Sequence, residues 1–265
     1  MDEDGDRDGG ASGPTRTPSA GPTSHEYRPG LAAFPHLPPG VIAAPVVVMI
    51  PGGGWQTADP TGLEPLAAAL AALGIVAVPV VIRAAEDGVV YPTPVEDVLC
   101  ALADGAATAT AGGIRPTRLV LLGHSSGAHL SSLATLDPTS VSPRCDDPVV
   151  APDALVGLAG PYDIRDFSGA AARLFADDAG EATWDAANPL LLADRRPEVP
   201  VLLLHGDEDE LVPATFSTNF ADALREGGHP TTLSILPGVD HAEVYSAQVA
   251  SAPVAQWLAS LPPPG

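Results

Sequence analysis

Short β-branched runs alternate with longer Ala- and Leu-rich stretches along most of the chain. Short apolar runs indicate buried strands, and the longer stretches indicate helices. Strands are predicted at Val46–Ile50, Ile75–Ile82, Leu119–Leu122, Ala154–Ala159, Val201–Leu204 and Thr231–Leu236, and helices at Leu63–Leu73, from Pro94 to Ala103 and beyond, and at Ala128–Leu136, Phe216–Arg225 and Ala247–Leu258. Strands that alternate with helices predict a mostly parallel sheet, with right-handed crossovers and helices on both faces.

Two segments depart from this alternation. Residues 1–26 are rich in Gly, Asp, Ser, Thr and Pro and carry few large apolar side chains. Such a segment buries too little surface to offset its ordering entropy, so we expect a disordered acidic tail before a single domain over residues 27–265. Residues 161–198 are longer than a simple crossover and form a small insertion. Its aromatic residues predict either one boundary of a pocket or a small satellite core.

The charge of the chain narrows the range of partners. Its formal net charge is −21, from 33 acidic residues against 12 basic ones, and every basic residue is Arg. Nucleic acid and anionic lipid bind to cationic surfaces, so neither partner is expected. The apolar runs stop short of the ~20 residues that a membrane-spanning helix needs. The acidic start, Met1–Asp4, is unlike a signal peptide, and we expect a cytoplasmic protein.

The two cysteines, Cys100 and Cys145, have neither a disulfide framework nor metal-ligand spacing. We interpret both as structural, with Cys100 as a small core residue of a helix, and a disulfide between them stays open. No metal or organic cofactor is expected.

The segment Gly123–Gly127, with the sequence GHSSG, carries the strongest chemical signal. A predicted strand enters it and a predicted helix leaves it, which is the context of a serine nucleophile on a strained strand-to-helix turn. The spacing of the two glycines selects Ser125 rather than Ser126, because side chains at the flanking positions would clash. In this arrangement the backbone N–H of Ser126 is one expected oxyanion donor.

A serine hydroxyl needs a histidine base, which a carboxylate orients. In the chain order serine, acid, histidine, His241 is the predicted base because it lies in a loop after the last strand. The acid should follow the preceding strand. Four acidic residues stand together there, and their chemistry alone does not select one: Asp207, Glu208, Asp209 and Glu210.

The Gly-rich segment Pro51–Trp55 follows the first predicted strand of the sheet. Glycines let backbone N–H groups approach a substrate closely, as an oxyanion loop requires. The alternative is an ordinary Gly-rich turn without a catalytic role.

With these residues in place, the chain resembles α/β-hydrolase fold enzymes of the esterase and lipase group, namely the hormone-sensitive-lipase-like, feruloyl-esterase-like and kynurenine-formamidase-like families. The resemblance runs from about Pro45 to the C-terminus. It rests on PGGGW at 51–55, Tyr91-Pro92 with Asp97, GHSSGAHL at 123–130, GPYD at 160–163 and HGDEDELVP at 205–213. It implies that Asp209 is the acid and His241 the base, and that Gly53 and Gly54 donate to the oxyanion.

The chain departs from the family pattern at two places. Pro51 stands where the family usually carries a histidine that helps to hold the oxyanion loop, so this loop must be held in another way. The stretch between Tyr27 and Pro45 is short for the opening strands of the fold, which predicts shortened or irregular N-terminal strands.

These observations predict a serine hydrolase that cleaves small or medium carboxylic esters through an acyl-enzyme. Two alternatives stay open. One is an amidase such as an arylformamidase, because the same machinery cleaves activated amides. The other is a non-catalytic binding protein on the hydrolase scaffold, which Pro51 motivates. The expected partner is a small-molecule ester or amide, and the sequence does not indicate an oligomeric state.

Overall fold

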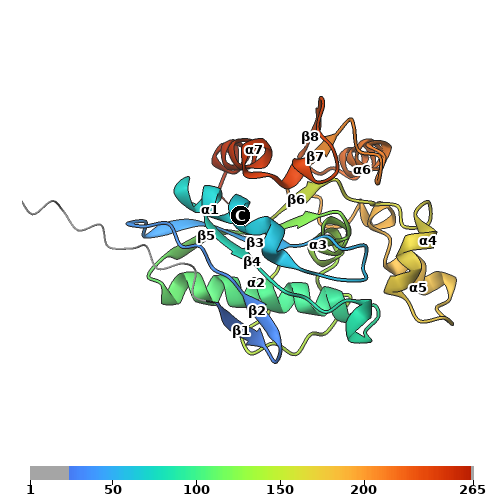
Figure 1. Cartoon of the computed structure of the whole chain (residues 1–265), viewed down its shortest axis with the longest axis horizontal. Helices are drawn as coiled ribbons and strands as arrows, with labels where there is room; N and C mark the ends of the chain where they lie inside the picture. The colour runs from blue at the N-terminus through green and yellow to red at the C-terminus, as the bar shows by residue number, and fades with distance from the viewer. Residues whose placement is uncertain (1–23, 264–265) are drawn as a thin grey trace, which may run out of the picture.

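The computed structural model describes residues 24–263 and contains a six-stranded sheet in the order β4-β3-β5-β6-β7-β8 (Figure 1). All neighbouring pairs in this sheet are parallel. The strands are β3 (Ala43–Ile50), β4 (Val76–Pro79), β5 (Arg115–His124), β6 (Ala154–Leu158), β7 (Val201–Gly206) and β8 (Thr231–Leu236). The predicted α/β class with a mostly parallel sheet is therefore confirmed.

Helices cover both faces of the sheet, as Figure 1 shows. Successive side chains of β3 alternate between two cores, with Val46 and Val48 in one and Val47 and Met49 in the other. The first core is shared with α2 (Thr93–Ala111), α3 (Ser126–Leu136) and α6 (Thr215–Glu226), and the second with α1 (Glu64–Ala72) and α7 (Ala247–Ser260). Because side chains of a strand point alternately to opposite faces, an almost continuous apolar run fills both layers.

The N-terminal strands are short, as predicted. Strands β1 (His25–Arg28) and β2 (Leu31–Ala33) form a separate antiparallel pair, which contacts the main sheet through isolated bridges from Ala33 and His36 to the β4 region. Most of the expected tail lies outside the described residues. Its last two residues, His25 and Glu26, belong to β1, so the ordered domain begins slightly earlier than residue 27.

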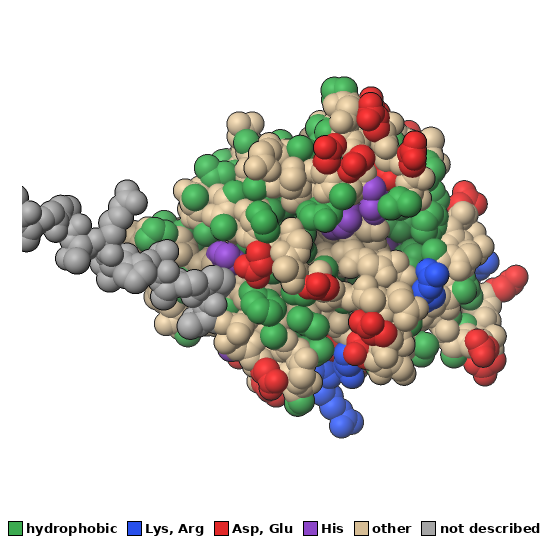
Figure 2. Space-filling model, viewed as in Figure 1, with side chains coloured by type: hydrophobic (Ala, Val, Ile, Leu, Met, Phe, Trp, Pro, Cys, Tyr) green, Lys and Arg blue, Asp and Glu red, His purple; other side chains and the backbone are tan. Residues whose placement is uncertain are grey.

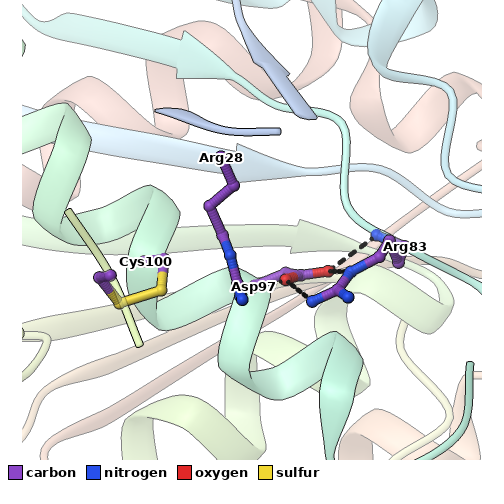
Figure 3. The surroundings of a disulfide bond; sticks show 5 residues. Arg28, Arg83, Asp97 and Cys100 are labelled. Carbon is purple, nitrogen blue, oxygen red and sulfur yellow. Dashed lines mark hydrogen bonds and ion pairs between the residues drawn. A yellow bond between two sulfur atoms is a disulfide. The ribbon is translucent and has the colours of Figure 1, made fainter. Parts of the chain in front are cut away.

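A fully buried carboxylate, Asp97 on α2, ties this N-terminal pair to the domain (Figure 3). Its Oδ1 accepts hydrogen bonds from Arg28 Nη1 at 2.6 Å and from Arg83 Nη2 at 2.7 Å. Its Oδ2 accepts from the backbone N–H and the Nε of Arg83 at 3.0 and 2.9 Å. Two cations around one buried anion satisfy its lone pairs, which burial of a charge requires.

Cys100 and Cys145 form a disulfide that joins α2 to the loop between α3 and β6 (Figure 3). The sequence left this pairing open, and Cys100 is also the buried residue that its helical setting predicted. Closing a loop with a separation of 45 residues stabilises the fold by about 4 kcal/mol in the chain-entropy account. Disulfides are typical of oxidising compartments, so this bond does not favour the predicted cytoplasmic location.

The insertion at residues 161–198 contains two short helices, α4 (Ser168–Ala171) and α5 (Glu181–Ala186), and two 3-10 turns, η3 (Ala172–Leu174) and η4 (Pro189–Leu192). Its aromatic residues serve both predicted purposes. Phe175 stacks on Trp184 with ring centroids 4.2 Å apart, which makes a satellite cluster. Phe167 instead packs 6.2 Å from the Trp55 ring and lines a pocket.

In the part of the chain that the structure describes, no helix has both the length and the apolar character needed to span a bilayer. The same residues contain no group of three or more His, Cys, Asp or Glu side chains placed to hold a metal ion.

Candidate active site

Ser125 lies on a sharp turn between β5 and α3, with φ 53° and ψ −124°. This backbone conformation is strained for a residue with a side chain. A Cβ at Gly123 would overlap the carbonyl of Gly127, and a Cβ at Gly127 would overlap the carbonyls of Ile50 and Pro51. The two glycines are therefore required for the reason that the motif predicted, which is the close approach of the chain on both sides of the serine.

The structure brings the three predicted catalytic side chains together. His241 Nε2 lies 3.0 Å from Ser125 Oγ, and His241 Nδ1 lies 2.6 Å from Asp209 Oδ2. Each residue follows the carboxyl end of a different parallel strand, namely β5, β7 and β8. Parallel strands deliver their carboxyl ends to one edge of the sheet, so residues far apart in the sequence meet there.

Asp209 differs from the acidic residues beside it in its exposure to solvent. Asp209 is buried, whereas Asp207, Glu208 and Glu210 are exposed. Its Oδ1 accepts hydrogen bonds from the backbone N–H groups of Leu211 and Val212 at 2.9 and 2.8 Å, which leaves Oδ2 for His241. Backbone donors stabilise the ionised carboxylate, the form that orients an imidazole.

A second histidine, His205, supports Asp209 from inside the fold. Its Nε2 donates to the carbonyl of Val212 at 2.8 Å and lies 3.1 Å from Asp209 Oδ2, while its Nδ1 lies 2.7 Å from Ser217 Oγ. Burial lowers the pKa of His205, so the neutral ring holds the acid loop without adding a charge. The sequence analysis assigns no role to His205, although a polar residue that closes the apolar run Val201–Leu204 is a usable signal.

His124, which precedes Ser125, holds the backbone of His241. Its Nε2 donates to the carbonyl oxygen of His241 at 2.8 Å, and the two rings lie 4.8 Å apart. Burial, with a smaller contribution from His241, lowers the pKa of His124 to about 4. A neutral His124 ring places no positive charge beside the His241 ring. The sequence did not indicate this role, because it depends on a contact across 117 positions.

The predicted oxyanion loop turns tightly around Gly53, whose carbonyl accepts from the N–H groups of Gln56 and Thr57 at 3.0 and 3.3 Å. Gly53 has φ 147°, and a Cβ there would overlap Thr57. Within residues 24–263, no protein acceptor takes the N–H of Gly53, Gly54 or Ser126. All three residues line the pocket, so these donors are free for a ligand.

The loop is held without the histidine that Pro51 replaces. Trp55 Nε1 donates to His129 Nδ1 at 3.2 Å, and His129 Nε2 donates to the carbonyl of Ala187 at 2.8 Å. Burial lowers the pKa of His129 to about 4, so the ring stays neutral and can accept from the tryptophan. Trp55 and His129 are both buried. A tie from α3 thus anchors the end of the loop.

A pocket of about 430 Å³ opens over Ser125. One wall, which we call the Asp59 wall, consists of Asp59, Gly62, Leu63 and Tyr245 and lies over the α1 and α7 layer. The opposite wall contains Trp55 and Phe167 and lies over the α2 and α3 layer, with Pro161, Leu211 and Val212 beside it. This volume is that of a site for a small or medium ligand.

A family model and two relatives of known name match most of this chain. Residues 36–224 match the BD-FAE family. The chain is 32% identical over 228 residues to the "probable carboxylic ester hydrolase LipM" of Mycobacterium tuberculosis, which covers 75% of this chain and 49% of that protein. It is 28% identical over 268 residues to the esterase LipQ of the same species, which covers 92% of this chain and 62% of that protein. This chain thus spans about half to three fifths of the length of these relatives.

Solved structures resemble the whole domain. A thermophilic esterase from Thermogutta terrifontis, with propionate bound, superposes with a TM-score of 0.73 at 21% identity, covering 90% of this chain and 92% of that one. An acetyl ester-xyloside bifunctional hydrolase from Caldicellulosiruptor lactoaceticus gives 0.74 at 24% identity, covering 87% and 88%. At these identities the likeness concerns the fold, and the predicted α/β-hydrolase fold is confirmed.

Proposed function

Because the chain belongs to the BD-FAE family, we propose that it is a serine hydrolase that cleaves carboxylic esters of small or medium size through an acyl-enzyme. The alignment of Ser125, His241 and Asp209 at 3.0 and 2.6 Å carries the proposal. Two relatives that are named as ester hydrolases support it further.

In the proposed reaction, Ser125 Oγ attacks the ester carbonyl while His241 Nε2 takes the hydroxyl proton. The carbonyl oxygen becomes an oxyanion and accepts hydrogen bonds from the N–H groups of Gly53, Gly54 and Ser126. His241 then delivers the proton to the leaving alcohol as the ester C–O bond breaks. A water molecule attacks the acyl-serine in the second half of the reaction, with the same base, and releases the carboxylic acid.

The test is the change Ser125→Ala, measured with a p-nitrophenyl ester and with a fluorophosphonate probe. We expect turnover to fall by at least about 10³-fold and labelling to disappear, because the variant lacks the attacking oxygen. The far-UV circular dichroism and Tm should match the wild type, because Ser125 Oγ contributes no buried hydrogen bond besides that to His241. Undiminished turnover by Ser125→Ala would refute the proposal.

The two alternatives make different predictions in this assay. An amidase would turn over N-formylkynurenine faster than simple esters, whereas an esterase would show the reverse order. A binding protein would stay unlabelled by fluorophosphonate in its wild-type form. The tie from Trp55 to His129 weighs against the binding protein, because it anchors the loop that Pro51 seemed to leave unsupported.

A further inference from the structure

Asp59 is the one carboxylate among the residues that line the pocket over Ser125. It caps the 3-10 turn η1 (Pro60–Leu63), where its Oδ1 accepts from the N–H and the hydroxyl of Thr61 at 2.9 and 2.5 Å. Among residues 24–263, no donor reaches its Oδ2. The hydrogen bonds from the Thr61 side chain and backbone lower the pKa of Asp59, so the group is ionised at neutral pH. Asp59 is exposed at the rim of the pocket, so the cap occupies one oxygen and leaves the other open.

The rest of the Asp59 wall is apolar and aromatic. The Tyr245 ring lies 4.4 Å from the His124 ring and is partly exposed, and Leu63 lies beside it. Gly62 packs against this ring, because a Cβ there would come within 3.3 Å of it. A carboxylate that lines the same pocket as an aromatic ring and apolar carbon suits a cation that carries its own alkyl groups. Such a cation is weakly hydrated and is attracted to the face of an aromatic ring.

The surroundings strengthen this preference for positive charge. Exposed acidic residues follow β7 and flank His241, namely Asp207, Glu208, Glu210, Asp240 and Glu243. Figure 2 shows acidic side chains gathered around the histidines on this face. No arginine lines the pocket, and Arg173, whose Nη1 would lie 3.9 Å from a Cβ at Gly54, approaches the oxyanion loop outside the lining residues. A chain of net charge −21 concentrates cations near such a cleft.

The Asp59 wall also lies on the side of the leaving group. Its residue Tyr245 contacts His124, and His124 holds the carbonyl of His241. His241 delivers the proton to the leaving alcohol, so we place that alcohol beside His241, on the side of the Tyr245 and His124 contact. The acyl group is then directed toward the opposite wall, which Trp55 and Phe167 form.

We propose that the Asp59 wall binds a quaternary or alkylated ammonium group on the alcohol part of the ester, so that esters of amino alcohols are preferred substrates. This inference rests on the proposed esterase function. The reaction balances as any ester hydrolysis does. Ser125 Oγ displaces the amino alcohol, which leaves with the proton from His241, and water releases the carboxylic acid.

The test compares a choline ester with the 3,3-dimethylbutyl ester of the same acid, which has the same shape without the charge. We expect the wild type to show a kcat/KM at least about tenfold higher for the choline ester, in line with a carboxylate and an aromatic ring acting on one cation. In Asp59→Asn this ratio should fall about tenfold, because the variant removes the anionic partner of the cation. Asparagine is also a good capping residue, so the turn at Pro60 should persist.

A matched control removes one negative charge elsewhere. Glu226 is exposed at the end of α6, from which the chain leads to the amino end of β8, opposite the pocket. Glu226→Gln should keep the wild-type ratio, which separates the local contact of Asp59 from a change in total charge. Equal rates for both esters in the wild type, or a ratio unaffected by Asp59→Asn, would overturn the inference.

A readout that does not need turnover distinguishes the two proposals. In Ser125→Ala, calorimetry should detect binding of choline, and the added change Asp59→Asn should weaken it about tenfold. If the wild type hydrolyses neither ester and stays unlabelled by fluorophosphonate, the esterase proposal fails. If labelling occurs but choline does not bind, the cation site alone fails.

Discussion

Two cavities of nearly equal volume, about 430 and about 440 Å³, lie at opposite edges of the parallel sheet. The first is lined by residues that follow the carboxyl ends of β3, β5, β6, β7 and β8. The second is lined by residues near the amino ends of strands, including Arg118, Asp153, Pro200 and Pro230. Volume therefore does not distinguish the two cavities. They differ in whether their polar groups already have hydrogen-bond partners in the protein.

In the amino-edge cavity the donors are already satisfied. Arg118 donates to the carbonyls of Asp153, at 3.5 Å, and Pro262. Arg196 donates to the carbonyls of Thr135 and Pro152 at 2.7 and 2.9 Å. These bonds join β5 and the segments before β6 and β7 to the end of α3 and to the residues after α7. In the carboxyl-edge cavity, by contrast, backbone donors and a serine hydroxyl face the open space. The polar groups of that cavity can therefore bind a ligand, whereas those of the amino-edge cavity stabilise the fold.

The largest test of this contrast is Gly53→Ala in the oxyanion loop. A Cβ at this position would overlap Thr57, so the loop must shift and its donors with it. We expect kcat/KM for a p-nitrophenyl ester to fall by about 10²–10³-fold. Gly40→Ala is the control, because Gly40 also has a positive φ, of 72°, but a Cβ there meets nothing within 4 Å. Full activity in Gly53→Ala would mean that the loop does not hold the oxyanion.

The second test uses acid, because the two histidines whose pKa is lowered to about 4, His124 and His129, belong to the carboxyl edge. The pKa values of His124 and His129 are lowered to about 4 in the folded protein, against about 6.5 in an unfolded chain. The unfolded chain binds more protons between these values, so this stability is complete above pH ~6.5 and is lost as the pH falls toward about 4.

In His129→Gln the free energy of unfolding should decline less over this pH range, by an amount on the order of 3 kcal/mol. Urea unfolding measured from pH ~7 down to pH ~4 would show it as a smaller decline in the free energy of unfolding. An Arg118 variant should keep the wild-type decline, because guanidinium groups do not titrate in this range. An identical decline in His129→Gln and the wild type would contradict the neutral, buried state of the His129 ring.

The smallest expected effect concerns the amino edge. Arg118→Gln should lower the free energy of unfolding by about 1–3 kcal/mol, because partly buried carbonyls lose their donors. The kcat/KM of the folded variant should equal that of the wild type. A loss of kcat/KM at a temperature where the variant is fully folded would show that the two edges are coupled.

The sequence predicted most of the fold, since apolar runs bounded by Gly and Pro define the strands. Thr231–Leu236 has the predicted bounds. Strand β5, in contrast, begins at Arg115 rather than at Leu119, because its first residues pair with the start of β3 and not because they are apolar. Pairing partners extend a strand beyond what its own pattern indicates.

The site was predictable where a local pattern carries the chemistry. Ser125 follows from two glycines, and His241 from its place after the last strand. The choice of Asp209 needed the family resemblance, because burial separates it from its neighbours only in the folded chain. The contacts of His124, His129 and His205 were not predicted, because each is a tertiary contact. Only His205 had a local signal, as the polar residue that closes a buried apolar strand.

The tie from Trp55 through His129 to Ala187 has a consequence for changing this protein's substrate range. Ala187 is the C-cap of α5, so the insertion beside the pocket and the Gly-rich loop share one anchor. We expect substitutions in α5 that are meant to widen the pocket to shift the proposed oxyanion donors as well. Selectivity and speed are therefore not separate design variables here, and libraries in that helix should be screened for both.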